Sequence, residues 1–218
     1  MKVINLGQTD SVLNNFVAQM RDKDIQKDSM RFRRNLERLG EIFAYEVSKT
    51  LGYTTKQVIT PLGIADVNVV SDKVVVATIL RAGLPLHNGV LNYFDSAENA
   101  FIAAYRKTSK SGKFHINFEY AALPETKDKV LILADTMLAT GSSIEVAYNH
   151  IVEEGGQPKH THFICPISSV QAIDNLKKNI PSDDVTLWTA ATDPELTLKS
   201  YIVPGLGDAG DLAFGPKL

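Results

Sequence analysis

Four short, predominantly apolar runs constrain the fold of this chain most strongly; they cover residues 74–80, 130–134, 162–167 and 185–188. Such runs are typical of parallel strands that are covered on both faces. Helical spacing fills the intervals at residues 84–93, 143–154 and 169–179. This alternation predicts a doubly wound α/β fold, with a mostly parallel twisted sheet flanked by helices.

Residues 1–55 show a helical pattern of apolar positions instead. One helix is expected around residues 13–20. A second begins near Ser29, which has the side chain of an N-cap, and ends at Gly52, which suits the position after a last helical turn.

Two further segments do not fit the alternation of strands and helices. Residues 113–120 alternate polar and apolar side chains, which predicts a half-exposed strand. Together with residues 101–105 this strand forms a β-arm at about 100–122, joined by the polar link 108–112. The glycine-rich tail, residues 200–218, is too irregular for helix or strand, and we expect a loop that lines a site. All of these segments are assigned to one domain, residues 1–218.

The charge balance and the single cysteine restrict the class of protein. The chain has 23 basic and 25 acidic residues, so nothing indicates the basic surface of a nucleic-acid-binding protein. Cys165 lies in an apolar run, which predicts a buried and inert thiol, and a cytoplasmic location is the default. No apolar stretch approaches the ~20 residues that span a bilayer, and the first ten residues lack the apolar region of a signal peptide.

The sharpest motif is a buried strand that ends in Asp135, followed by a turn of small residues and a helix. In open α/β sheets, ligands bind at the carboxyl ends of the strands, and a helix N-terminus attracts anions. Thr140, Ser142 and Ser143 add hydroxyl donors, Gly141 permits a close backbone approach, and Asp135 suits the vicinal hydroxyls of a ribose. This pattern predicts a site for a phosphorylated ribose. The alternative is an ordinary strand-to-helix turn with Ser142 as N-cap.

This motif, D-T-M-L-A-T-G-S-S at residues 135–143, resembles the loop of type I phosphoribosyltransferases that binds 5-phosphoribosyl-1-diphosphate (PRPP). The uracil phosphoribosyltransferase version, D-P-M-L-A-T-G-G-S, is the most similar. Residues 79–85 resemble the diphosphate-binding strand end of that family, and residues 201–211 resemble its uracil-binding loop almost residue for residue. Residues 36–51 and 60–62 are also similar, so the resemblance covers most of the chain.

The resemblance implies transfer of phosphoribose from PRPP to uracil, giving UMP and diphosphate in pyrimidine salvage. It also implies Mg²⁺ held mainly by PRPP rather than by protein ligands, and a homo-oligomer. The catalytic residues that it implies are Arg81, Arg106 and Asp135. The implied PRPP site comprises Arg81, Arg106, Asp135, Thr136, Met137, Leu138, Ala139, Thr140, Gly141, Ser142, Ser143 and Asp208. The implied uracil site comprises Ile202, Gly207, Asp208 and Ala209.

Physical chemistry agrees with the residue types at these positions. The departing diphosphate accumulates negative charge, and a planar guanidinium binds phosphate oxygens in a bidentate manner. Uracil is small, flat and neutral, so main-chain groups in a glycine-rich loop can match its amide edges. Tyr201, at the start of that loop, is expected to be a core residue rather than a neighbour of the base.

This sequence departs from the family pattern at several places. Thr136 replaces a proline and Ser142 a glycine, while Leu212 and Pro216 stand where an arginine and a threonine are expected. These departures leave open a paralogue that binds without turnover. Two further interpretations stay open at this point: a phosphoribosyltransferase for another base, and a regulatory protein that binds PRPP or UMP and reads RNA.

Two groups of side chains are interpreted as mainly structural. Arg31, Arg34 and Arg38 form a stripe on one helix, which predicts a solvated or interface face; a second anion site, for GTP as an effector, is the alternative. His160 and His162 alternate along a strand and share a face, and no histidine shows the spacing of metal ligands.

Overall fold

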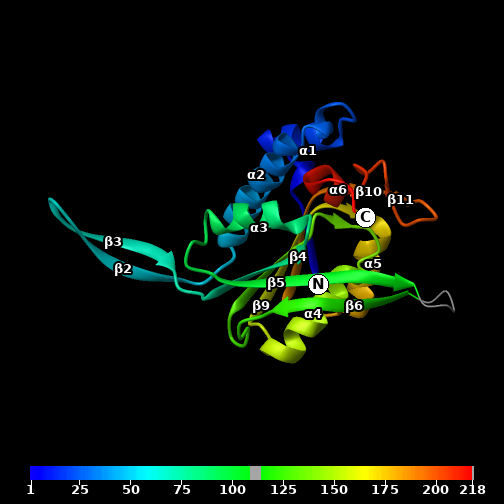
Figure 1. The fold of residues 1–218 in the computed structure, drawn as a ribbon. Helices are drawn as coiled ribbons and strands as arrows, with labels where there is room; N and C mark the ends of the chain where they lie inside the picture. The colour runs from blue at the N-terminus through cyan, green and yellow to red at the C-terminus, as the bar shows by residue number, and fades with distance from the viewer. Residues whose placement is uncertain (109–113, 218) are drawn as a thin grey trace.

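The computed structural model describes residues 1–108 and 114–217, and the side chains of these residues outside 104–119. Its central sheet has the strand order β1-β10-β9-β7-β4-β5-β6, and β8 adds to β9 (Figure 1). Neighbouring strands are parallel except for β5 and β6. The strands are β1 Lys2–Asn5, β4 Val74–Leu80, β5 Glu98–Thr108, β6 Phe114–Ala122, β7 Val130–Ala134, β8 Met137–Leu138, β9 His160–Ser169 and β10 Val185–Asp193.

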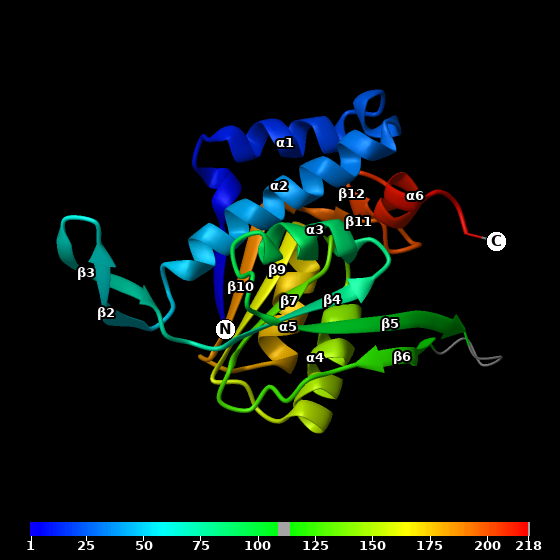
Figure 2. The same ribbon diagram turned by 60° about the vertical axis from the view of Figure 1, so that its left-hand side comes forward.

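Helices cover both faces of this sheet, as Figure 2 shows. Helices α1 (Val12–Arg21), α2 (Ser29–Ser48) and α3 (Gly83–Leu91) lie on one face, and α4 (Ser142–Gly155) and α5 (Val170–Asn179) on the other. Successive residues of the strands alternate between two buried clusters: Val74 and Val76 pack with α2, whereas Val75 and Ala77 pack with α4 and α5. The predicted mostly parallel sheet flanked by helices is therefore confirmed.

The predicted caps of the long helix were wrong by a few residues. The N-cap of α2 is Asp28, whose carboxylate accepts a hydrogen bond from the Arg31 amide at 3.0 Å, and Ser29 is the first helical residue. The helix ends at Ser48, and Gly52 lies beyond the C-cap residue Lys49. An aspartate satisfies a free amide as well as a serine does, so the boundary moves by one position.

The helical prediction for residues 1–55 missed β1, and the hairpin that begins at Tyr53 was not predicted. Strand β1 pairs with β10 at one edge of the sheet, and β2 (Tyr53–Thr60) pairs with β3 (Gly63–Val70) in an antiparallel hairpin. This hairpin projects away from the sheet and the helices (Figure 1, cyan). Its apolar side chains are strongly exposed, with Ile59 at 87% and Leu62 at 100%.

The two remaining segments also contain regular structure. Strands β5 and β6 occupy the residues expected to form a β-arm, and residues 109–113 of its link lie outside the described residues. The tail, expected to be irregular, contains β12 (Ile202–Val203), which pairs with β11 (Glu195–Leu196), and the short helix α6 (Ala209–Phe214). No helix among the described residues has the length and apolarity needed to cross a membrane.

The sheet topology identifies where a ligand would bind. From β4 the chain passes to β5 on one side, and β7, β9 and β10 then follow on the other side of β4. The strand order therefore reverses between β4 and β7. In open α/β sheets a ligand crevice opens at the carboxyl ends of the strands that flank such a reversal.

Candidate active site

A cavity of about 270 Å³ opens at this reversal point. Three segments that are far apart in the sequence form its walls: the end of β4, the turn between β7 and α4, and the tail from Ser200 to Gly210. The lining residues are Ile79, Leu80, Arg81, Ala82, Asp135, Thr136, Met137, Ala139, Ser143, Ser200, Tyr201, Ile202, Gly207, Asp208, Ala209, Gly210 and Lys217. The strand-end arginine, the ribose-type turn and the glycine-rich tail thus meet in one place.

Arg81 directly follows β4 and reaches toward the tail. Its Nη2 lies 3.4 Å from an Asp211 carboxylate oxygen and donates to the Gly215 carbonyl at 3.3 Å. Both contacts are long for charged hydrogen bonds, and the Arg81 Nε is buried without a hydrogen-bond partner. A guanidinium held this loosely is available to an anionic ligand in the cavity.

The turn after β7 is shaped by Asp135 and Gly141. The Asp135 carboxylate accepts a hydrogen bond from the Thr136 amide at 2.7 Å, which orients it at the cavity wall. Gly141 is the N-cap of α4 and has a φ of +86°, a conformation that strongly favours glycine. Its place before the helix lets the N-terminus of α4 face the turn, as an anion site requires.

Side chains from β9 and α5 hold the main chain of this turn from behind. Ser169 Oγ donates to the Ala139 carbonyl at 2.6 Å, and Asn175 Nδ2 donates to the Thr140 carbonyl at 3.0 Å. The Thr140 and Ser142 hydroxyls are 3.0 Å apart. Because these bonds occupy two of the turn's carbonyl groups, its conformation is fixed before any ligand binds.

The tail contributes the opposite wall of the cavity. Asp208 is the N-cap of α6 and accepts a hydrogen bond from the Asp211 amide at 3.0 Å. On the outer side, Arg33 of α2 donates to the Ala213 carbonyl at 2.7 Å, which ties α6 to the body of the protein. The position of Ile202, Gly207 and Ala209 at the cavity therefore depends on a tail that is bonded at several points.

The structure places most of the predicted site residues at this cavity. The residues of the implied PRPP and uracil sites that line it are Arg81, Asp135, Thr136, Met137, Ala139, Ser143, Ile202, Gly207, Asp208 and Ala209. Leu138, Thr140 and Gly141 line a smaller adjoining hollow under the turn, and Ser142 lines neither. The backbone of Arg106 pairs with Ile116 in the β-arm, and its side chain lies outside the described part of the structure.

Several residues of the cavity wall were not predicted as site residues, and two of them, Lys217 and Tyr201, have side chains that bear on ligand binding. Lys217 is the second cation in the cavity wall after Arg81. Its place depends on the path of the chain after α6, for which the sequence carries no signal. Tyr201 was expected in the core, but it is 48% exposed and lines the cavity. The strand β12 turns its neighbour Ile202 into the core instead, with 4% exposure.

Leu212, which stands where the family resemblance predicts an arginine, packs against the core cluster that also contains Ala209 and Ala213. It is absent from the cavity wall. Its side chain is therefore an apolar anchor for α6 rather than a missing ligand contact.

Cys165 and the histidines whose side chains the structure describes (His87, His150, His160 and His162) are absent from the cavity wall. Burial raises the pKa of the Cys165 thiol well above its ordinary value, and the nearby Asp135 charge acts in the same direction, so the thiol stays protonated. The predicted burial of Cys165 is confirmed, and the raised pKa agrees with an unreactive thiol. The rings of His160 and His162 lie 4.6 Å apart on one face, as predicted. Among the described side chains, no cluster of three or more His, Cys, Asp or Glu could hold a metal ion.

The arginine stripe of α2 is engaged with neighbouring side chains. Arg34 forms ion pairs with Glu37 at 2.8 Å and Glu41 at 3.3 Å. The hydrogen bond from Arg34 holds the pKa of the Glu37 carboxyl below its ordinary value. The Arg38 guanidinium lies 5.1 Å from the centre of the Phe16 ring. These contacts agree with a solvated face that is neutralised within the helix.

Comparisons with known proteins agree with this geometry. The family model for uracil phosphoribosyltransferase matches residues 8–216. A uracil phosphoribosyltransferase from Porphyromonas gingivalis is 56% identical over 218 residues, which is 100% of both chains. One from Pyrococcus furiosus is 37% identical over 202 residues, covering 91% of this chain and 84% of the relative. The solved structure of the AQ2163 protein from Aquifex aeolicus superposes with a TM-score of 0.85 at 28% identity and 98% coverage of each chain.

Proposed function

This chain belongs to the uracil phosphoribosyltransferase family, and we propose that it transfers the phosphoribosyl group of PRPP to uracil, giving UMP and diphosphate. One observation carries the proposal: Arg81, the turn from Asp135 to Ser143 and the tail around Gly207 line the same cavity. Two alternatives were left open by the sequence: transfer to another base, and a regulatory protein that reads RNA. The family match does not favour either of them.

The reaction exchanges one bond at the anomeric carbon of the ribose. The bond to the diphosphate oxygen breaks with its electron pair, the bond to a ring nitrogen of uracil forms, and that nitrogen releases its proton. Arg81 is placed to stabilise the charge that develops on the diphosphate. The turn after β7 binds the 5′-phosphate through amides and hydroxyls, and the Asp135 carboxylate accepts hydrogen bonds from the ribose hydroxyls. Arg106 belongs to the same proposal through the family resemblance alone.

Mg²⁺ is part of this proposal as a partner of PRPP. Asp135 and Asp208 both line the cavity, and two carboxylates fit an ion that keeps most of its ligands from phosphate and water. When bound, the ion would neutralise charge on the diphosphate. No dedicated protein cage is required for that role.

The uracil site rests on main-chain recognition by the tail. Gly207 has a φ of +94° and nothing lies within 4 Å of the position of an added Cβ, so its backbone is open to the cavity. Ile202 and Ala209 flank it, and the exposed ring of Tyr201 borders the same space. A small planar base with two amide edges matches such a wall.

The deciding experiment measures UMP formed from uracil and PRPP with Mg²⁺, in the parent protein and in Arg81→Ala. We expect product from the parent and a rate lower by about 10²–10³-fold in the variant, since one stabilising donor is removed. Addition of EDTA should stop the parent reaction. If the parent yields no UMP although PRPP protects it against thermal unfolding, uracil is the wrong acceptor or the chain is a binder without turnover.

Three finer assignments complete the proposal. The exposed apolar residues of the β2–β3 hairpin, such as Ile59, Leu62 and Ile64, support a homo-oligomer, because surfaces of this kind mark contacts between proteins. If the protein sediments as a monomer at the concentration used in the assay, the homo-oligomer is ruled out. GTP as an effector is tested by measuring the rate of UMP formation with and without GTP, and an unchanged rate would exclude activation by GTP.

A cytoplasmic location is proposed from the single-cysteine composition, and fractionation of cells would test it.

A further inference from the structure

A partly buried ion pair contacts the tail segment that lines the cavity. Arg21 is the last residue of α1, and Asp193 is the last residue of β10. The two guanidinium nitrogens Nη1 and Nη2 donate to Asp193 Oδ2 and Oδ1 at 2.8 and 2.7 Å. Asp193 is 5% exposed, whereas the Arg21 side chain is 22% exposed, so the carboxylate end of this bidentate pair is shielded from water.

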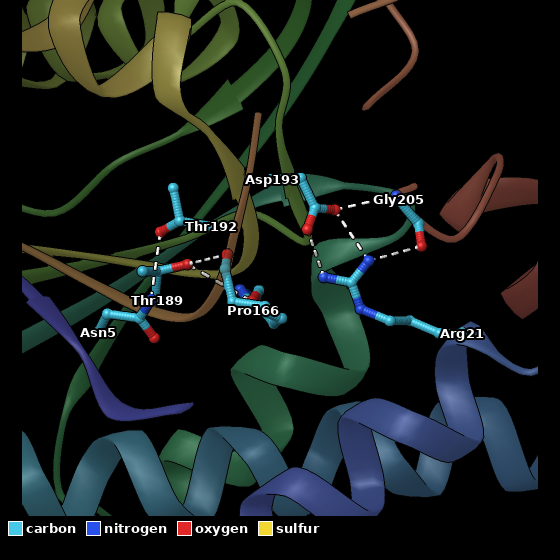
Figure 3. A network of polar contacts seen from close by, with 8 residues as sticks. Asn5, Arg21, Pro166, Thr189, Thr192, Asp193 and Gly205 are labelled. Atoms are coloured by element: carbon cyan, nitrogen blue, oxygen red, sulfur yellow. Dashed lines mark hydrogen bonds and ion pairs between the residues drawn. The ribbon is translucent and has the colours of Figure 1, made fainter. Parts of the chain in front are cut away.

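The same two side chains also hold the main chain of Gly205 on both sides (Figure 3). Arg21 Nη1 donates to the Gly205 carbonyl at 2.9 Å, and the Gly205 amide donates to Asp193 Oδ2 at 2.9 Å. Four hydrogen bonds therefore join α1, β10 and the tail in one closed arrangement. We call these three residues the Gly205 clamp.

The backbone at Gly205 leaves no room for a side chain. Its φ is +53°, and an added Cβ would lie 2.2 Å from the Ile202 carbonyl oxygen. Ile202 and Gly207, on either side of the clamped residue, line the cavity, whereas Arg21, Asp193 and Gly205 do not. The clamp therefore sets where the cavity wall lies without touching a bound ligand.

Resting on the uracil site proposed above, we infer that Arg21 and Asp193 are positioning residues that fix the base-binding loop and so set the selectivity for uracil. Main-chain recognition of a base depends on donors and acceptors held at fixed places, and small displacements of such groups are costly. Removing Arg21 leaves the Asp193 carboxylate buried and unpaired, and removing the Asp193 charge frees the Arg21 guanidinium, so the loop that both residues hold at Gly205 shifts. The phosphate-binding turn is held separately, by Ser169 and Asn175, and stays in place.

The test compares kcat, the KM for each substrate and the preference for uracil over cytosine in Asp193→Asn, Arg21→Lys and Arg21→Met. Cytosine differs from uracil in one amide edge, so the preference reports how well that edge is read. We expect Asp193→Asn and Arg21→Met to raise the KM for uracil by about tenfold or more and to weaken the preference. The KM for PRPP should stay within about twofold. Arg21→Lys keeps the positive charge but loses the bidentate guanidinium, so its KM for uracil and its base preference should lie between those of the parent and of Arg21→Met.

Glu98→Gln supplies the matched control. It converts an acid to its amide in the Lys129–Glu98 pair, 2.7 Å long, at the opposite ends of the strands from the cavity. This variant should keep the parent values of both KM and the base preference. Thermal unfolding of every variant separates lost stability from lost selectivity, and Arg21→Lys decides the question if the others do not fold.

Two outcomes would overturn parts of this reasoning and can be told apart. If the parent forms UMP but the folded variants keep its KM for uracil and its base preference, the clamp has no positioning role and the proposed function stands. If the parent itself forms no UMP, the proposed function fails and this inference fails with it.

Discussion

Replacing His162 by asparagine should remove a large part of the acid sensitivity of this protein's stability. His162 is 2% exposed in β9, and its Nδ1 accepts a hydrogen bond from the Trp188 indole at 3.1 Å. Burial lowers the pKa of His162 from 6.5 to about 3, and the neighbouring His160 acts in the same direction. The folded protein therefore keeps this ring neutral.

The sign and the size of the effect follow from proton linkage. Between pH 6.5 and about pH 3 the unfolded chain binds a proton at this histidine and the folded chain does not. The free energy of unfolding therefore falls as the pH falls through this window. Each factor of ten in proton affinity is worth about 1.4 kcal/mol, so this histidine alone costs about 3 kcal/mol by pH 4.5 and about 5 kcal/mol in full.

Urea unfolding of the parent and of His162→Asn at pH 7 and pH 4.5, followed by the fluorescence of the single tryptophan, Trp188, measures this difference. Asparagine keeps an acceptor for the Trp188 indole but does not titrate, so other acidic and basic groups contribute equally to both proteins. We expect the parent to lose about 3 kcal/mol more than the variant between the two pH values. Equal losses would show that His162 titrates normally in the folded protein and would refute the reasoning.

Two further predictions concern the site. Gly141→Ala should lower the free energy of unfolding by about 1–2 kcal/mol and raise the KM for PRPP, because alanine resists a φ of +86° and its Cβ would lie 3.2 Å from Leu176 Cγ. Urea unfolding and steady-state kinetics measure the two effects, and an unchanged KM for PRPP would contradict the prediction. Leu212→Arg should cost about 1–3 kcal/mol of stability without lowering the KM for PRPP, since Leu212 packs on the core; tighter PRPP binding would show that this position does face the ligand.

The sheet could be predicted from the sequence because its strands are buried on both faces. Each of the strands β4, β7, β9 and β10 contains a predominantly apolar run, and such runs are typical of the centre of a parallel sheet. The β2–β3 hairpin was missed for the opposite reason. All eight residues of β2 are exposed, so no face of the strand is apolar and no period of two appears, although β-branched residues are frequent in it.

The site was predicted in outline because three of its segments carry their own motifs. Strand ends, a small-residue turn and a glycine-rich tail are visible in sequence, and the topology brings them together. The supporting side chains are not visible, because their role depends on tertiary contacts. Ser169 and Asn175 reach the turn from β9 and α5. Arg21 reaches Gly205, 184 residues away, and no local pattern indicates such a contact.

The departures from the family pattern in the turn are compensated locally. A proline at position 136 would have no amide hydrogen, whereas Thr136 donates to Asp135 Oδ1 at 2.7 Å and is 2% exposed. The start of the turn, which a proline ring makes rigid in the family pattern, is held here by the Thr136 hydrogen bond and by burial of that side chain. Ser142 avoids the left-handed region, because the positive φ falls on Gly141, and its hydroxyl meets Thr140. Since both substitutions leave Asp135 and the N-terminus of α4 at the cavity, neither gives a physical reason to expect a binder without turnover.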